Sequence, residues 1–277
     1  MGTESIVFGP WIGEFGWEIA RWIPACRFIA RGHKGKKYAI GPRSHGILYE
    51  FVDEYIPLDK SFKYIPWMFT AKSYNKRQFN AYKSKASSLG RVISPDIIRP
   101  KKDFKMLGKK FQGSLHWRIR DITDRPIMCV FPRQRAHDAY RNWPISKWVQ
   151  TIKFFCDAGF AVMSFGGPED KRLDYENDNY FDFIEYDKDD ELDLCVSALN
   201  LAEIGVTIQS GGFYVSLFSC KNTLIFGIER YVKRVKEENI LNANYEYIVC
   251  KDFQFNPKHV IRHVQRSLKG RRSRGSG

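Results

Sequence analysis

The chain has 277 residues, 43% of them hydrophobic, which suffices for one large or two medium-sized domains, and its formal net charge is +14. It contains no run of about 18 apolar residues, and its N-terminus lacks the basic and apolar regions of a signal peptide. These features argue against a membrane-spanning or secreted protein and predict a cytoplasmic one.

Six cysteines are spread along the sequence, and none of them forms a C-x-x-C pair. Most lie in apolar runs, which is typical of small buried side chains in a reducing compartment. The spacing therefore argues against a zinc site or a disulfide framework. The six are Cys26, Cys129, Cys156, Cys195, Cys220 and Cys250.

The first 58 residues alternate between apolar runs and helical patterns. Pro24 marks a kink or a break in the first helix, because proline cannot donate the backbone hydrogen bond of a helix interior. The order strand, helix, strand, helix, strand is typical of a parallel sheet. The predicted strands are 5–8, 37–40 and 54–58, and the predicted helices are 17–30 and 46–53.

Aromatic and basic residues interleave in the next segment, whose secondary structure is harder to predict. Such a pattern suits base stacking combined with phosphate contacts. A helix with an apolar inner face and a basic outer face explains it equally well. The residues concerned are Lys72, Tyr74, Lys76, Arg77, Phe79, Tyr82, Lys83 and Lys85.

A second series of strands and helices follows a predicted linker at 121–126. It divides the chain into an N-terminal domain, 1–125, and a C-terminal domain, 126–268. The basic, Gly- and Ser-rich tail 269–277 is expected to be disordered. The predicted strands are 127–131, 160–165, 181–186, 204–208 and 223–226, and the predicted helices are 145–158, 189–201, 212–219 and 256–268.

Charge is distributed unevenly between these parts. Residues 1–125 carry a net charge of +13, residues 126–265 carry −4, and residues 266–277 carry +5. A basic domain attracts anionic partners through its long-range field. The N-terminal domain is therefore expected to bind an anionic ligand, a nucleic acid or a charged glycan.

Two glycine-rich turns each follow an apolar run and precede a helical pattern. They are Gly13-Glu14-Phe15-Gly16 and Gln209-Ser210-Gly211-Gly212. A turn of this kind points unpaired backbone N–H groups and the positive end of a helix dipole at one spot. Two such turns, one in each half of the chain, predict two nucleotide-fold domains.

Arginines follow the first strand of the second domain, in Pro132-Arg133-Gln134-Arg135 and at Arg141. Loops at the carboxyl ends of parallel strands meet at one edge of the sheet, where ligands bind. We therefore expect these arginines to converge with the turn from Ser210 to Gly212. Guanidinium groups and helix N–H groups together suit a diphosphate.

Six short runs of the second half form an ordered pattern: Phe131-Pro132-Arg133, Arg141-Asn142-Trp143-Pro144, Gly159-Phe160, Gly166-Gly167-Pro168-Glu169-Asp170, Gln209-Ser210-Gly211-Gly212 and Leu224-Ile225-Phe226-Gly227. With this pattern, the second half of the chain resembles the C-terminal domain of heptosyltransferase-like GT-B glycosyltransferases. Gly13-Glu14, followed by Ile23-Pro24, is similar to the Gly-Asp turn of that family. The resemblance covers roughly 1–40 and 127–230.

The resemblance implies an α/β fold of two Rossmann-like domains around an interdomain cleft, with the nucleotide sugar held by the C-terminal domain and the acceptor by the N-terminal one. It places Glu14 at the position of the general base, and Glu18, one helical turn later, is the competing candidate. The family's Asp-Ser/Thr-Gly turn here begins with Gln209, and the histidine that usually follows it is absent.

The candidate site residues fall into three groups. The candidate bases are Glu14 and Glu18. The candidate donor-binding residues are Arg133, Arg135, Arg141, Gly166, Gly167, Ser210, Gly211, Gly212 and Glu229, the last as a partner of a ribose hydroxyl. The candidate acceptor-binding residues are Trp11, Trp17, Lys72, Lys76 and Arg77.

Together these features predict an inverting hexosyl- or pentosyltransferase, which moves a sugar from a nucleotide-diphosphate sugar to a hydroxyl of a glycan or of modified DNA. No cofactor or metal is expected, because no D-x-D motif stands at a strand end; Asp187-Lys188-Asp189 lies in an acidic run that opens a helix. The alternative is a non-catalytic nucleic-acid-binding protein on a nucleotide-binding fold. A nucleotide-sugar epimerase is disfavoured, because residues 9–16 lack a Gly-x-Gly-x-x-Gly turn.

Overall fold

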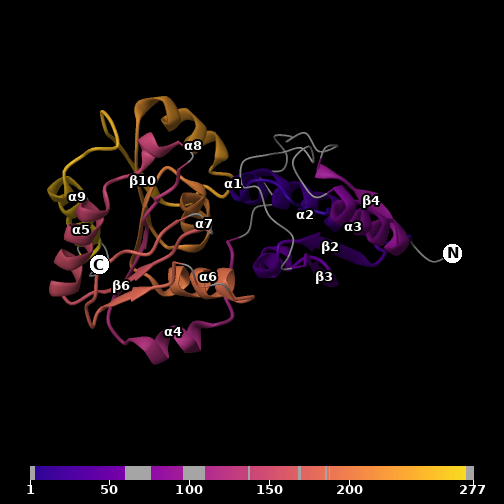
Figure 1. Cartoon of the computed structure of the whole chain (residues 1–277), viewed down its shortest axis with the longest axis horizontal. Coiled ribbons are helices and arrows are strands. Elements are labelled where there is room, and N and C mark those ends of the chain that lie inside the picture. The colour runs from indigo at the N-terminus through magenta and orange to yellow at the C-terminus, as the bar shows by residue number, and fades with distance from the viewer. Residues whose placement is uncertain are drawn as a thin grey trace. The chain divides into compact units, whose positions relative to one another are not determined.

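The computed structural model describes residues 4–59, 76–95, 110–136, 138–167, 170–184, 186 and 188–272. The chain forms two compact units (Figure 1). The first unit comprises Met1–Phe111 with Lys188–Asp193, and the second comprises Gln112–Asp187 with Leu194–Gly277. Helix α4 (His116–Ile122) lies in the second unit, so the predicted linker at 121–126 begins inside a helix.

The first unit is built on a parallel sheet in the order β3-β2-β1-β4. Its strands are β1 (Ile6–Phe8), β2 (Lys37–Gly41), β3 (Glu54–Pro57) and β4 (Arg91–Ile93). The first three were predicted, because their residues form short apolar runs. Strand β4 was not predicted. It has only three residues and a single turn residue, a glycine, before it, so the sequence shows no recognisable strand pattern there. It pairs with β1, with Ile6 opposite Arg91.

Helix α3 (Lys76–Leu89) packs against this sheet and contains the described part of the basic, aromatic segment. Phe79 and Ala86 are buried in the core formed with β1 and β2, whereas Lys83 and Lys85 are exposed. In the described part of the segment, an apolar inner face and a basic outer face account for the pattern. Lys72 lies outside the described residues, as do the side chains of Lys76 and Arg77.

The helix after β1 changes its winding along its length. A short α-turn, α1 (Phe15–Trp17), leads into a π-helical stretch, η1 (Glu18–Trp22), and then into α2 (Ile23–Gly32). Pro24 stands in the first turn of α2, where its missing N–H is tolerated. The helix predicted at 46–53 is instead a 3₁₀ helix, η2 (Arg43–Tyr49).

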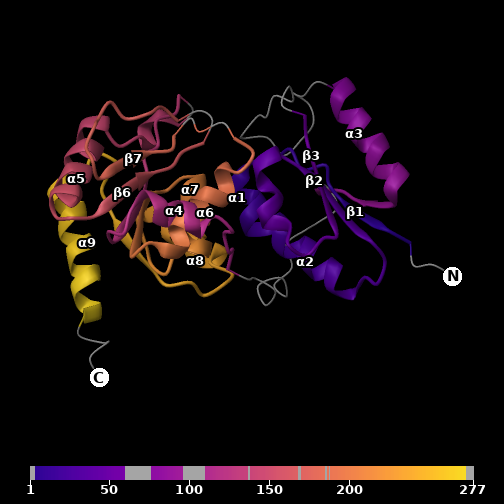
Figure 2. The ribbon, with the colours of Figure 1, turned by 90° about the horizontal axis from the view of Figure 1, so that it is seen from below.

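The second unit contains a six-stranded parallel sheet in the order β10-β9-β8-β5-β6-β7. Helices cover it, and α5 and α9 lie side by side in both views (Figures 1 and 2). The strands are β5 (Ile127–Phe131), β6 (Ala161–Ser164), β7 (Tyr180–Asp182), β8 (Ile204–Ile208), β9 (Thr223–Gly227) and β10 (Tyr245–Val249). The remaining helices are α5 (Ile145–Asp157), α6 (Glu191–Leu201), α7 (Gly211–Ser219), α8 (Val232–Glu238) and α9 (Pro257–Arg272).

Most of these elements were predicted, and four of them need correction. Strand β7 is shorter than the predicted 181–186, and β10 and α8 were not predicted. Helix α9 continues to Arg272, so the first residues of the predicted disordered tail are helical.

The interior of the second unit is rich in large side chains. Trp143 and Trp148 are fully buried and meet edge to face, with ring centroids 4.9 Å apart. All six cysteines are buried, as predicted. No helix of the described residues is long and apolar enough to cross a membrane.

Candidate functional site

The loop after β5 is held in shape by Arg133, which is only 2% exposed. Its guanidinium donates to the backbone carbonyl of Asp138, at 3.0 Å, and to the side-chain oxygen of Asn142. Burial, followed by the nearby charges of Arg141 and Arg135, lowers the pKa of Arg133 to about 10. Its buried position favours a structural role over the predicted contact with the donor.

Asp170 joins this loop to the one after β6. The carboxylate is 4% exposed and accepts bonds from Arg135, whose Nε and terminal nitrogen lie 3.1 and 2.9 Å away. It also accepts the backbone N–H groups of Gln134, at 2.9 Å, and Gly167, at 2.8 Å. Arg135 and Gly167, both predicted to bind the donor, are thus brought together through a carboxylate that neutralises the charge of Arg135.

Arg141 and Gln209 lie together at the carboxyl end of β8. Arg141 donates to the Asp138 carboxylate, at 2.5 Å, and approaches the backbone carbonyl of Gln209 at 3.4 Å. Gln209 is 3% exposed. The Nε atom of Arg141 and the side-chain oxygen of Gln209 are buried and have no hydrogen-bond partner among the described residues. Buried polar groups normally have partners, in the protein, in ordered water or in a ligand, so these two atoms make this edge of the sheet a candidate site for a polar ligand.

The N-terminus of α7 completes this site. Ser210 is the N-cap, in an extended conformation, and its side chain makes no capping hydrogen bond. The first-turn N–H groups of such a helix bind anions. A Cβ on Gly212 would lie 2.6 Å from the Phe131 ring, so glycine allows α7 to approach β5. Of the predicted donor contacts, Arg141, Ser210, Gly211 and Gly212 are the ones that the structure brings to a site with unmet hydrogen bonds.

An exposed aromatic cluster lies at the carboxyl end of the neighbouring strand β9. Arg230 donates to the hydroxyls of Tyr140, at 2.7 Å, and Tyr231, at 3.2 Å, and these two hydroxyls are 3.1 Å apart. Tyr140 is 50% exposed. Glu229 precedes the cluster and is exposed at the start of the 3₁₀ helix η7 (Glu229–Tyr231). Its place after β9 agrees with the predicted sheet edge, whereas the tyrosines were not singled out.

In the first unit, Glu14 and Glu18 have very different surroundings. Glu14 is half-buried at the N-cap of α1, and its backbone carbonyl accepts the N–H groups of Trp17 and Glu18. Glu18 is fully buried, and both of its carboxylate oxygens have partners, His45 at 2.7 Å and Tyr49 at 2.8 Å. The acceptor hydroxyl of a substrate has no access to Glu18 in this geometry, which disfavours it as the direct base.

The two tryptophans predicted to bind the acceptor also differ. Trp11 is 3% exposed and stacks on Trp22, with ring centroids 5.5 Å apart and planes inclined by 17°. It belongs to the core, which corrects its predicted role. Trp17 is partly exposed and carries the guanidinium of Arg21 over its ring at 3.8 Å. A partly exposed indole beside a cation remains suited to contacts with a polar acceptor.

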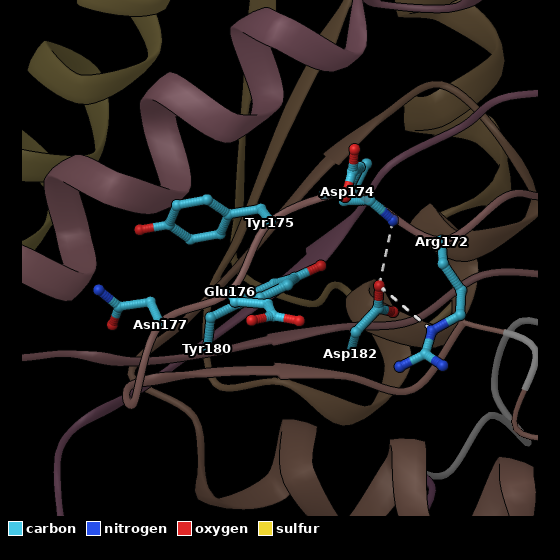
Figure 3. Close-up of a pocket in the computed structure, with 8 residues that line it drawn as sticks. Arg172, Asp174, Tyr175, Glu176, Asn177, Tyr180 and Asp182 are labelled. Carbon is cyan, nitrogen blue, oxygen red and sulfur yellow. Dashed lines mark hydrogen bonds and ion pairs between the residues drawn. The ribbon is translucent and has the colours of Figure 1, made fainter.

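A separate polar cleft of about 360 Å³ borders the edge strand β7 (Figure 3). Arg172 lies 3.8 Å from Asp182, whose carboxylate accepts bonds from Ser164 and from the backbone of Leu173 and Ile184. These bonds hold the long loop between β6 and β7. Among the described residues, no three His, Cys, Asp or Glu side chains come together as metal ligands, here or elsewhere.

Comparisons with known proteins bear on the fold. No protein-family model and no curated protein sequence matches the chain. In structure it is similar to a glycosyl transferase family 9 protein from Veillonella parvula DSM 2008, with a TM-score of 0.62 and 12% identity over 97% of this chain and 98% of that one. It is likewise similar to the E. coli ADP-heptose LPS heptosyltransferase II, with a TM-score of 0.63 and 12% identity over 98% and 100% of the two chains.

The chain has the GT-B fold. A third similar structure, an E. coli heptosyltransferase with ADP, has a TM-score of 0.57 and 12% identity over 95% of this chain and 99% of that one. The resemblance inferred from the sequence is thus confirmed at the level of the fold, with two Rossmann-like domains. Within that GT-B fold, Arg141, Gln209 and the α7 N-terminus lie at the carboxyl edge of the second sheet, where such folds bind ligands.

Sequence reasoning missed Asp170, His45 and Tyr49 as parts of the candidate site. Asp170 was visible as the last residue of the Gly166-to-Asp170 motif. His45 and Tyr49 carried no local signal, since they become significant only through their contacts with Glu18, 27 and 31 residues earlier in the chain.

Proposed function

We propose that the protein is a glycosyltransferase that moves a sugar from a nucleotide-diphosphate sugar to an acceptor hydroxyl. The observation that carries this proposal is the unmet hydrogen-bonding capacity of Arg141 Nε and the Gln209 side-chain oxygen beside the N-terminus of α7. The similarity in fold to solved glycosyltransferases supports it.

The donor diphosphate would lie against Arg141 and the first-turn N–H groups of α7. A guanidinium and a helix N-terminus both stabilise negative charge, and the charge on the departing diphosphate grows in the transition state. The Gln209 oxygen would accept a bond from a hydroxyl of the donor. These groups supply positive charge without a metal ion, so we propose a metal-independent reaction, in which full activity is retained in EDTA.

The acceptor side of the reaction belongs to the first unit. Sugar transfer needs a group that takes the proton of the attacking hydroxyl, and the resemblance places Glu14 at that position. A single displacement of this kind inverts the configuration of the sugar. The burial of all six cysteines as single side chains of an apolar interior agrees with a reducing compartment such as the cytoplasm.

The charge of +13 on residues 1–125 favours an anionic acceptor, either an acidic glycan or modified DNA. A nucleic-acid acceptor predicts that KM rises steeply between about 50 and 200 mM salt, because binding releases counterions. A constant KM over that range would argue for a glycan with few charges.

Nucleotide binding tests the proposal directly. Thermal unfolding is followed with ADP, GDP, UDP, CMP and dTDP and their sugar conjugates. We expect one nucleotide class to raise the unfolding temperature by several degrees, and Arg141→Ala to abolish the rise. Arg120→Ala, an exposed arginine of α4, is the matched control. If no nucleotide raises the unfolding temperature, the proposal fails.

The same basic charge favours one alternative, a non-catalytic nucleic-acid-binding protein on this fold. The double substitution Glu14→Gln and Glu18→Gln separates the two. A transferase loses turnover and keeps donor binding, whereas a binding protein keeps its affinity for nucleic acid and has no turnover to lose.

A further inference from the structure

A buried carboxylate–imidazole pair lies in the first unit. Glu18 is completely buried, and its Oε2 atom lies 2.7 Å from Nδ1 of His45. Its other oxygen, Oε1, accepts the hydroxyl of Tyr49 at 2.8 Å. The Tyr49 oxygen in turn accepts the indole N–H of Trp22 at 3.0 Å. Both oxygens of Glu18 are therefore occupied inside the protein.

These contacts decide which nitrogen of His45 carries a proton. The Trp22 indole can only donate, so the single hydrogen of the Tyr49 hydroxyl points to Glu18. Burial, and then the charge of Glu18, raise the pKa of Tyr49 well above its ordinary value, so this hydroxyl keeps its hydrogen. An ionised carboxylate also only accepts, so Nδ1 of His45 must donate to it. The lone pair of the neutral ring is then on Nε2.

Nε2 of His45 is the unengaged end of this chain of hydrogen bonds. The side chain is 13% exposed, and among the described residues Nε2 has no hydrogen-bond partner. The Phe15 ring packs against the imidazole, with centroids 5.0 Å apart, and fixes its orientation from the side.

The pair also lies at the ligand-binding edge of its sheet. Glu18 is in the helix that follows β1, and His45 is in the 3₁₀ helix that follows β2. These strands are paired and parallel, so both residues follow carboxyl ends, where α/β sheets bind ligands. Glu14 begins the same helix as Glu18.

We infer that His45 is the catalytic base of the proposed transfer and that Glu18 is its positioning residue. The inference rests on the proposed function. Nε2 takes the proton from the acceptor hydroxyl, and the oxygen's electron pair forms the bond to the anomeric carbon. The bond from that carbon to the donor diphosphate breaks, and its electron pair leaves with the diphosphate. The imidazolium that forms is stabilised by the buried carboxylate of Glu18.

This assignment differs from the one implied by the family resemblance, which places the base at Glu14. A histidine held by a carboxylate is suited to proton transfer near neutral pH. Glu14 would then orient the acceptor by accepting a second hydrogen bond.

The kinetics of variants test the assignment. The substrate is the nucleotide sugar that the thermal-unfolding experiment selects, and water serves as the acceptor. The rate is measured as release of the nucleoside diphosphate. His45→Ala should lower kcat by about 10²–10⁴-fold without changing nucleotide affinity, and added imidazole should restore part of it. Glu18→Gln should also lower kcat, but imidazole should not restore it, because this variant keeps the His45 ring and lacks the carboxylate. His33→Ala, a histidine at the end of α2 and outside this pair, should match the wild type.

The possible failures are distinct. If the wild type binds no nucleotide, the proposed function fails and the inference with it. If it binds and turns over but His45→Ala keeps its kcat while Glu14→Gln loses it, only the inference is overturned. If turnover with water is too slow to measure, nitrogen NMR of the His45 ring decides. A proton on Nδ1 of the neutral ring supports the inference, and a proton on Nε2 overturns it.

Discussion

Replacing Asp170 by alanine should destabilise the second unit strongly. The carboxylate is 4% exposed and joins Arg135 to the backbone N–H groups of Gln134 and Gly167. Removing one partner of a buried ion pair costs about 3–5 kcal/mol, because the other charge is left unpaired. The Arg135 side chain is 22% exposed, so water compensates part of this loss and the lower end applies. We expect the free energy of unfolding to fall by about 3 kcal/mol.

Thermal unfolding followed by circular dichroism measures this loss. At about 2–4 °C for each kcal/mol in a domain of this size, the midpoint should fall by roughly 6–12 °C. Asp178→Ala is the matched control, since that carboxylate is exposed, and it should shift the midpoint by less than about 2 °C. If the midpoint of Asp170→Ala stays within the range of the control, Asp170 does not hold the two loops together and the reasoning is refuted.

Three further predictions concern the donor site and the buried thiols. Gly212→Ala places a Cβ 2.6 Å from the Phe131 ring, so it should cost about 1–3 kcal/mol in urea unfolding; an unchanged midpoint would contradict this packing. Arg141→Lys should weaken binding of the selected nucleotide about 10-fold in calorimetry, because it loses the planar fork; equal affinity would remove Arg141 from the site. Burial raises the pKa of Cys156 and Cys250 to about 11 each, from an ordinary value of 9.0. The unfolded chain therefore releases these protons first, and the free energy of unfolding should decrease as pH rises from about 9 to 11. Urea titrations at pH 7 and 10 measure this decrease, and an equal free energy of unfolding at the two values would contradict the prediction.

The sequence predicted most of the second unit well, for a local reason. Strands β5 and β8 are each five buried residues long and were predicted at their observed bounds. A strand covered on both faces reads as a continuous apolar run, whatever its neighbours are. The edge strand β10 is only partly buried, so its residues form no such run, and it was missed. The order in which the strands pair within the sheet could not be predicted either, because local sequence patterns do not determine it.

The sequence predicted which residues of the candidate site share one sheet edge, but not how each side chain is engaged there. The glycine turn from Ser210 to Gly212 and the arginine at 141 were read correctly as parts of one sheet edge, because parallel strands place their carboxyl ends together. Whether a charged side chain is available there depends on its partners. Arg133 resembles Arg141 in sequence context, yet it is buried within its own loop.

By itself, the sequence determined the α/β class, most of the strands and helices, and the glycine turns, since these follow from residue types within a few positions of one another. The tertiary structure decided which polar groups are engaged. Arg135 meets Asp170 across 35 residues, and Glu18 meets His45 across 27. Pairs this far apart are brought together only when the sheets assemble, and burial then fixes their hydrogen bonds. That is why Glu18, a candidate base in the sequence, became the buried partner of a histidine.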